Sequence, residues 1–235
     1  MAPSIYDEDG DYLAFSTDAT AGDVRKVGAG ADDGRKHAYS DMSIWDIHRT
    51  QLPLLSLTAP DVFKDVLRSL QAMMAEGTGD VPRWPLLNIY TNCMIGAHAF
   101  VSMAEAVLKG QADGLDTHAL YASMRRAATT PRANGGRIAV NNWTDLGYIS
   151  VEAWEQGASA TLAYAFDDSA IATVAASVGD HANAAVFRNR STAAYKHLWS
   201  PKHQLLCILG FGLIATDFHG LLSFITTAPS CSAAC

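Results

Sequence analysis

Apolar residues recur at helical spacing over much of the chain from about residue 40 onward. The clearest stripe consists of Val62, Phe63, Val66, Leu67, Leu70, Met73 and Met74. Residues three and four apart share one face of an α-helix, so this stretch is predicted to be an amphipathic helix. Thr58 is its expected N-cap, Pro60 suits its first turn, and Gly77 and Gly79 are expected to end it.

Four further helices are predicted along the chain. They cover residues 95–109, 116–128, 159–178 and 181–199. The stretch 159–178 is apolar on several faces, which predicts a helix enclosed on most sides. Two prolines keep residues 81–86 extended, and 131–145 is predicted to be a loop.

Residues 1–39 are rich in Asp and Gly and show no helical periodicity. Residues 6–12 are expected to form a tight turn between two short extended pieces, and 22–34 to form an exposed loop. Asp7, Asp9 and Asp11 have the spacing of a calcium-binding loop, but Tyr12 stands where such a loop requires Gly. An EF-hand is therefore not predicted.

Helices that alternate with loops, without a strand pattern between them, favour an all-α fold of antiparallel helical hairpins. Hydrophobic residues make up 49% of the 235 residues and charged residues 17%, which argues against a disordered chain. The net charge of −7, from 17 basic and 24 acidic residues, argues against nucleic acid as a partner. The four cysteines form no CxxC pair, which argues against a zinc site and leaves their redox state open.

The most apolar stretch of the chain is residues 205–225. Its length suits a membrane span, but Thr216, Asp217 and His219 interrupt it, so a membrane partner is not expected. The N-terminus lacks the basic and apolar regions of a signal peptide. From these features alone the localisation is unknown.

Four blocks of sequence carry a resemblance. The first runs from Tyr39 to Gln51 and includes Trp45-Asp46-Ile-His-Arg49, and Pro53-Leu-Leu follows it. The second contains Pro82-Arg-Trp-Pro-Leu and then Tyr90-Thr-Asn92-Cys93-Met-Ile-Gly96-Ala-His98-Ala. The third is Ala160-Thr-Leu-Ala-Tyr164-Ala-Phe-Asp167-Asp168, and the fourth runs from Phe187 to Pro201. In order and spacing, over roughly residues 39–206, these blocks resemble the catalytic domain of glycoside hydrolase family 92, the calcium-dependent exo-acting α-mannosidases.

The resemblance implies an (α/α)6 toroid of paired helices with a sugar site at its mouth. It also implies hydrolysis of terminal α-linked mannose with inversion, a reaction that needs one acidic and one basic carboxyl group. The family motifs that carry this acid, this base and most calcium ligands have no match here, so no catalytic residue and no metal ligand is assigned. The family suggests a secreted or endomembrane protein.

A six-hairpin toroid needs about twelve helices, which take well over 200 residues at ordinary helix and loop lengths. The five or so predicted helices cannot close one. We therefore expect residues 40–207 to form an incomplete toroid and 1–39 an irregular segment with short β pieces. Residues 208–235 are expected to be an apolar tail that does not resemble the family. The chain is expected to be a catalytic-domain fragment that is inactive alone.

Seven residues of the first two blocks are candidates for sugar binding: Trp45, Asp46, Arg49, Arg83, Trp84, Asn92 and His98. A carboxylate such as Asp46 can accept two sugar hydroxyls at once, with Arg49 as its orienting partner. The alternative is an ordinary surface ion pair between these two residues at i and i+3. Trp45 could stack on a sugar face or belong to the core.

The remaining candidates have alternatives of the same kind. Arg83 and Trp84 lie on the proline-rich connection, and such connecting segments often carry function. Asn92 could meet a sugar hydroxyl or cap the following helix, and His98 could be a core histidine. Asp167 and Asp168 are expected to orient Arg or Tyr partners rather than to do chemistry.

A second hypothesis comes from a different functional class. An incomplete toroid with an open face could be a noncatalytic helical module that binds carbohydrate or a protein. The end hairpin would expose Val186, Tyr195, Leu198 and Trp199, so self-association through this open edge is also expected. Binding without turnover would distinguish the module from the enzyme.

Overall fold

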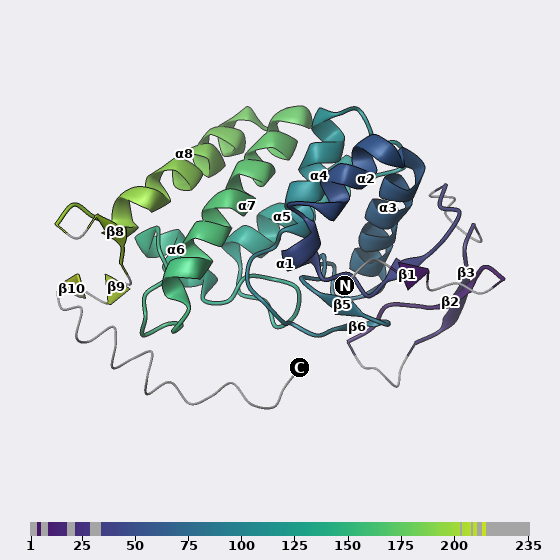
Figure 1. Ribbon diagram of the computed structural model, residues 1–235, viewed down its shortest axis with the longest axis horizontal. Helices are drawn as coiled ribbons and strands as arrows, with labels where there is room; N and C mark the ends of the chain where they lie inside the picture. Colours follow the sequence, from purple (N-terminus) through teal and green to yellow (C-terminus); the bar gives the residue numbers. More distant parts are fainter. Residues whose placement is uncertain are drawn as a thin grey trace.

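The computed structural model describes residues 4–5, 9–17, 22–28, 34–202, 204–207, 209–210 and 213–214. In this part of the chain the fold is mostly helical, as predicted, with only short two-stranded sheets (Figure 1). The helices are α1 (Ile44–Ile47), α2 (Gln51–Thr58), α3 (Pro60–Glu76), α4 (Ala99–Leu108), α5 (Thr117–Thr129), α6 (Val140–Leu146), α7 (Gly157–Ser177) and α8 (His181–Leu198).

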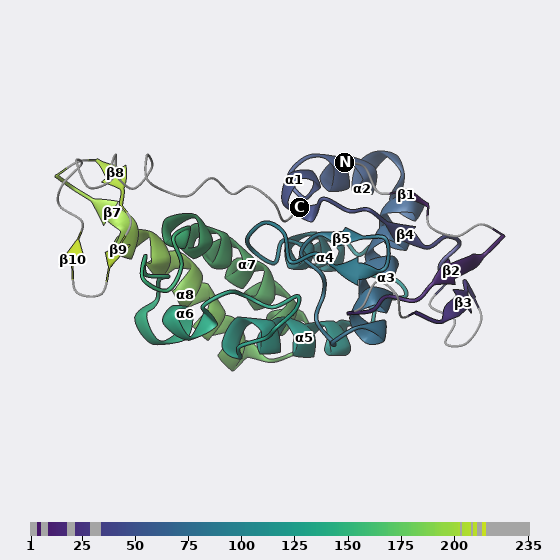
Figure 2. The same ribbon diagram turned by 90° about the horizontal axis from the view of Figure 1, so that it is seen from below.

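Helix α7 lies near the middle of the body and organises its neighbours. It forms a hairpin with α8 through a short connection at 178–180, and it also packs against α4 and α5. Helix α3 packs against α2 and α4. Figures 1 and 2 show α8 at one end of the body and α3 with the first strands at the other.

The strands form antiparallel pairs that hold loops together. Pairs β1–β4 and β2–β3 lie near the N-terminus, so residues 22–34, predicted to be a loop, contain a strand. Every residue of that strand is exposed, which explains why no alternation marks it. The pairs are β1 (Ser4–Ile5) with β4 (Tyr39–Ser40), β2 (Asp11–Leu13) with β3 (Val24–Lys26), β5 (Pro85–Leu86) with β6 (Ile89–Tyr90), β7 (Trp199–Ser200) with β8 (Leu205–Leu206), and β9 (Leu209–Gly210) with β10 (Leu213–Ile214).

The predicted apolar stripe is confirmed in α3, where Phe63, Val66, Leu67 and Leu70 are fully buried. The expected N-cap is wrong. Thr58 is the last residue of α2, and its hydroxyl donates to the carbonyl of Leu54 four residues earlier. Gly77 ends α3 as expected.

Two boundaries differ from the prediction. Helix α4 begins at Ala99 rather than near residue 95, because Met94 and Gly96 have left-handed φ angles of 62° and 78°. The predicted loop 131–145 contains α6, which has a left-handed Ala139 before it and brings Trp143 into the core. Both departures depend on backbone conformations that hydrophobic spacing does not encode.

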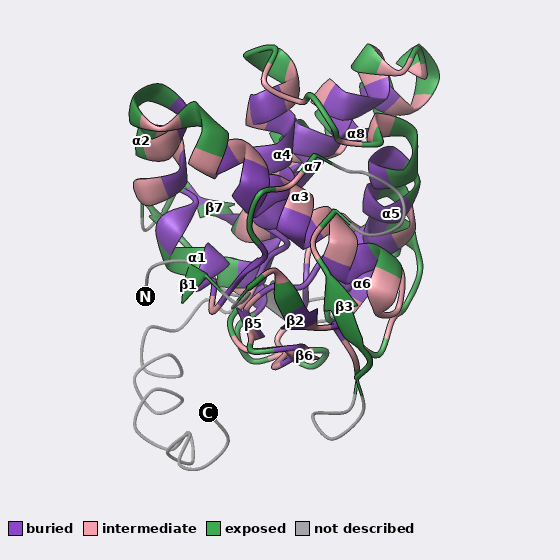
Figure 3. Ribbon diagram, turned by 90° about the vertical axis from the view of Figure 1, so that its right-hand side faces the viewer, coloured by how far each residue is buried: buried purple, intermediate pink, exposed green. Residues whose placement is uncertain are grey.

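Helix α7 is buried on most sides, as its composition predicts (Figure 3). A strip of exposed residues runs along it, consisting of Ser159, Leu162, Phe166 and Ser169. None of the helices in the described part of the chain has the length and hydropathy that a membrane span requires. The apolar stretch 205–225 lies largely outside the described residues. Asp7, the first of the three aspartates with calcium-loop spacing, lies outside them as well.

Candidate functional site

Helix α1 and the turn that follows it present three of the candidate residues together. Ile44 and Ile47 are buried and fix the inner side of this four-residue helix. Trp45 is 42% exposed, and Asp46 and Arg49 are exposed as well. One short turn of backbone therefore places an aromatic ring, a carboxylate and a guanidinium at the surface.

The predicted alternative for Asp46 and Arg49, a simple surface ion pair, is not what the structure shows. The guanidinium carbon of Arg49 instead lies 5.4 Å from the ring centre of Phe166, on the exposed strip of α7. This cation–π contact holds the Arg49 side chain against α7 and leaves the Asp46 carboxylate facing solvent.

The proline-rich connection is bonded to the segment that precedes α1. The Met42 amide donates to the Pro85 carbonyl at 3.2 Å, and the Leu87 amide donates to Asp41 Oδ1 at 2.9 Å. The Ser40 hydroxyl also donates to the Leu87 carbonyl. The first and second sequence blocks, about 40 residues apart, are therefore neighbours in the fold.

Arg83 is buried with most of its donors unused. Its side chain is 6% exposed, and Nη2 donates to the Asn92 carbonyl at 2.7 Å. The buried Nε and Nη1 of Arg83, and Nε1 of the half-buried Trp84, have no hydrogen-bond partner among the described residues. Burial lowers the pKa of the Arg83 guanidinium. Each unsatisfied buried donor costs about 1–3 kcal/mol, which points to acceptors supplied from outside these residues.

Asn92 connects two loops and caps no helix. Its side-chain nitrogen donates to Asn134 Oδ1 at 2.7 Å, and its oxygen accepts from the Gly135 amide at 3.2 Å. Because α4 begins seven residues later, at Ala99, the capping alternative for Asn92 is wrong. The side-chain nitrogen and oxygen of Asn92 are therefore both hydrogen-bonded within the protein.

His98 is a core histidine paired with a carboxylate. It is 4% exposed, and its Nδ1 lies 2.7 Å from Asp167 Oδ1. The other oxygen of Asp167 accepts from the Ala97 amide at 2.7 Å. The His98 ring also stacks on His48 of the first block, with 4.2 Å between ring centres. This environment keeps His98 away from the surface that α1 presents.

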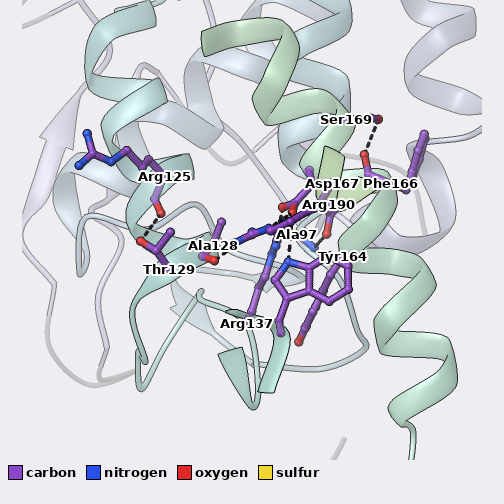
Figure 4. Close-up of polar contacts among 12 residues, drawn as sticks. Ala97, Arg125, Ala128, Thr129, Arg137, Tyr164, Phe166, Asp167, Ser169 and Arg190 are labelled. Carbon is purple, nitrogen blue, oxygen red and sulfur yellow. Dashed lines mark hydrogen bonds and ion pairs between the residues drawn. The ribbon is translucent and has the colours of Figure 1, made fainter. Parts of the chain in front are cut away.

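Asp168 joins a second set of buried partners. It accepts from Arg137 Nη1 at 2.7 Å, from Trp143 Nε1 at 3.0 Å and from Arg190 Nε at 2.7 Å (Figure 4). Asp168 and Arg137 are fully buried. Both carboxylates of the Asp167–Asp168 pair are thus occupied by partners, in agreement with the expected orienting role.

The four sequence blocks meet in this network. His48 comes from the first block, His98 from the second, the two aspartates from the third and Arg190 from the fourth. Sequence reasoning missed His48 and Phe166, which contact the candidates without standing out in any local pattern. Figure 4 shows Phe166 on the side of α7 turned away from Arg137 and Arg190.

The described residues do not fit the calcium that the resemblance implies. No group of three or more His, Cys, Asp or Glu side chains converges in the part of the chain that the structure describes. The buried carboxylates of Asp80, Asp167 and Asp168 are paired with Arg or His side chains. No step of the chemistry is therefore assigned to a metal held by these residues.

A cleft lies apart from these candidate residues. It has a volume of about 340 Å³ and lies beside the N-terminal strands, lined by Tyr12, Arg25, Arg35, Arg68 and Glu76 among others. None of the seven candidates lines it. Glu76 accepts from Tyr12 and from the Phe15 amide at 2.7 and 2.8 Å, which indicates a structural role.

The family model of the glycosyl hydrolase family 92 catalytic domain matches residues 1–217, a wider range than the four blocks. No curated protein matches the chain. Two structures of the family GH92 α-mannosidase BT3965 from Bacteroides thetaiotaomicron, one in complex with mannoimidazole, are similar with TM-scores of 0.78 and 0.79 at 26% identity.

The matched structures are much longer than this chain. The two BT3965 structures cover 93% of it, but it spans only 28% and 27% of their length. The family GH92 inverting mannosidase BT2199 from the same bacterium has a TM-score of 0.76 at 24% identity over 91% of the chain and 27% of its own. The similarity therefore concerns one part of a larger architecture.

Proposed function

Because the chain belongs to glycosyl hydrolase family 92, we propose that it forms part of an α-mannosidase catalytic domain and holds the terminal mannose of a glycan. The observation that carries this proposal is the surface of α1 and the turn that follows it, where Trp45, Asp46 and Arg49 are all exposed. A carboxylate can accept from two neighbouring hydroxyls, a guanidinium donates to ring or hydroxyl oxygens, and an aromatic face packs against the apolar face of a sugar. These are the groups that a neutral sugar needs.

Arg83 and Trp84 are the second part of the proposed site. Their unsatisfied donors are buried beside the strand pair that is bonded to the segment before α1. Hydroxyl oxygens of a sugar are suitable acceptors for such donors. Asn92 and His98 contribute indirectly, by fixing loops and helices around the site.

The proposed reaction is hydrolysis of terminal α-linked mannose with inversion. The acid and the base would come from polypeptide beyond this chain, within an (α/α)6 toroid of which residues 40–207 form one part. Calcium would be bound there as well. Without either proton transfer, each worth roughly 10²–10⁴-fold, the chain alone is expected to bind and not to hydrolyse. Turnover of an aryl α-mannoside that chelation abolishes would contradict this division of roles.

Asp46→Asn tests the binding role directly. The substitution keeps the size of the side chain but removes the charge, so two charge-assisted hydrogen bonds weaken. We expect the affinity for methyl α-mannoside, measured by nuclear magnetic resonance titration, to fall roughly tenfold or more. Asp61→Asn, at an exposed position in the first turn of α3, is the matched control and should leave the affinity unchanged. Equal affinities of all three proteins would show that α1 does not contact the sugar.

A further inference from the structure

Helix α1 depends on the side chain of His48. Its four residues are too few for a helix that is stable by itself. The Ile44 carbonyl at its start accepts two bonds from His48, one from the amide at 3.1 Å and one from the ring Nδ1 at 2.9 Å. His48 is 3% exposed, so this closure is made inside the protein.

The His48 ring is attached to the rest of the body through two further buried groups. It stacks on His98 with an angle of 26° between the rings, and His98 is bonded to Asp167 of α7. Phe166, whose ring is 6.0 Å from both imidazoles, also contacts Arg49. A continuous set of contacts therefore runs from α7 to the turn that carries Asp46 and Arg49.

The hydrogen bonds define the proton on His48. Because a carbonyl only accepts, Nδ1 carries the hydrogen, and Nε2 of the neutral ring is an unprotonated acceptor. This Nε2 is buried and has no hydrogen-bond partner among the described residues. A proton added there would lack an acceptor, because none of the described residues offers one within hydrogen-bond distance of Nε2.

The surroundings of His48 shift its pKa in both directions. Burial, which is the largest influence, together with His98 and then Arg49, lowers its pKa, whereas the Ile44 carbonyl and Asp167 raise it. The net pKa of His48 is about 4, below the ordinary 6.5. The unfolded chain binds a proton at His48 more readily than the folded chain does. The stabilisation that the uncharged His48 provides is therefore complete above pH 6.5 and is lost as the pH falls toward 4.

We propose that His48, His98 and Asp167 are positioning residues for the sugar site, and that an uncharged His48 is required to hold α1 so that Asp46 and Arg49 face the sugar. The effect on sugar binding rests on the proposed function of this site. The closure of α1 itself can be measured without any sugar.

The test compares His48→Asn with His48→Ala by hydrogen exchange. The Asn side-chain nitrogen can take the place of Nδ1 as donor to Ile44 and does not titrate, whereas Ala removes the donor. In the parent chain, the protection of the Asp46, Ile47 and His48 amides should fall roughly tenfold between pH 6.5 and 4, after correction for intrinsic exchange. It should stay constant in His48→Asn and be low at both pH values in His48→Ala. His118→Asn, on an exposed face of α5, is the matched control and should behave as the parent does.

Binding of methyl α-mannoside, which has no titrating group, provides the functional measurement. Its affinity should follow the protection of α1 in each variant, with His48→Asn restoring what His48→Ala loses. A parent-like pH profile in His48→Asn, or full protection in His48→Ala, would overturn the closure. Protection that changes as expected without a matching change in affinity would overturn the positioning role. A parent chain that binds no sugar at any pH would contradict the proposed function and leave the exchange result to decide the closure.

Discussion

Asp168→Asn is expected to destabilise the fold by about 3–5 kcal/mol, a large share of the 5–15 kcal/mol that holds a typical domain together. The carboxylate accepts from two guanidinium groups and an indole, and Arg137 on one side is fully buried. An amide offers one acceptor atom and no charge, so the buried Arg137 cation would lose its carboxylate partner and keep only the amide and the Tyr164 ring, 4.9 Å from its guanidinium carbon. Its Nε and Nη2 already lack partners among the described residues.

Urea denaturation followed by far-ultraviolet circular dichroism measures this effect. Asp145→Asn, at an exposed position in α6, is the matched control and should change the free energy of unfolding by less than about 0.5 kcal/mol. If Asp168→Asn is too unstable to purify, the double variant Asp168→Asn with Arg137→Met keeps the prediction testable. Removing both charges should recover part of the lost stability, because an apolar replacement of a buried pair is often nearly neutral. A loss below about 1 kcal/mol for Asp168→Asn would show that the network carries little of the stability.

The helices that could be predicted are those whose sequence signals are local. Helix α5 begins at the expected place because Asp116 caps it, with Oδ1 accepting from the Ala119 amide at 2.9 Å. Helix α8 begins after Asp180, which caps in the same way. Helix α6 was missed because it has seven residues and follows a left-handed Ala139, and neither property follows from hydrophobic spacing.

The candidate site could be predicted only where its residues are close in the sequence. Trp45, Asp46 and Arg49 lie together because they are neighbours in the sequence. The pairing of His98 with Asp167 joins residues 69 positions apart, and the stack of His48 on His98 joins two separate blocks. No local pattern specifies such partners, which depend on how α4 and α7 pack. The sequence around His48 likewise gives no signal that its side chain bonds back to the start of α1.

The chain is expected to associate through the C-terminal end of α8. Tyr195 is 49% exposed, Trp199 37% and Leu206 40%, and the first two rings stack with centres 5.6 Å apart. Leu206 lies opposite Trp199 in the β7–β8 pair, so the three side chains form one apolar patch. Leu198, which was expected on this open face, is instead buried. Val186 is exposed, but it lies more than two turns of α8 from Tyr195.

Tyr195→Glu combined with Leu206→Glu tests the association. Burying a large apolar side chain contributes about 1.5–3 kcal/mol, and a carboxylate in its place must lose its hydration when the patch is covered. The double variant should therefore dissociate with a constant at least roughly 100-fold higher than that of the parent, measured by sedimentation velocity over a concentration series. Leu108→Glu, at a position that is 74% exposed at the end of α4, is the matched control and should associate as the parent does. A parent chain that sediments as a monomer at every concentration would show that this patch is not an interface. If the control dissociates as readily as the double variant, the association depends on net charge rather than on apolar contact, because one added carboxylate would then suffice wherever it is placed.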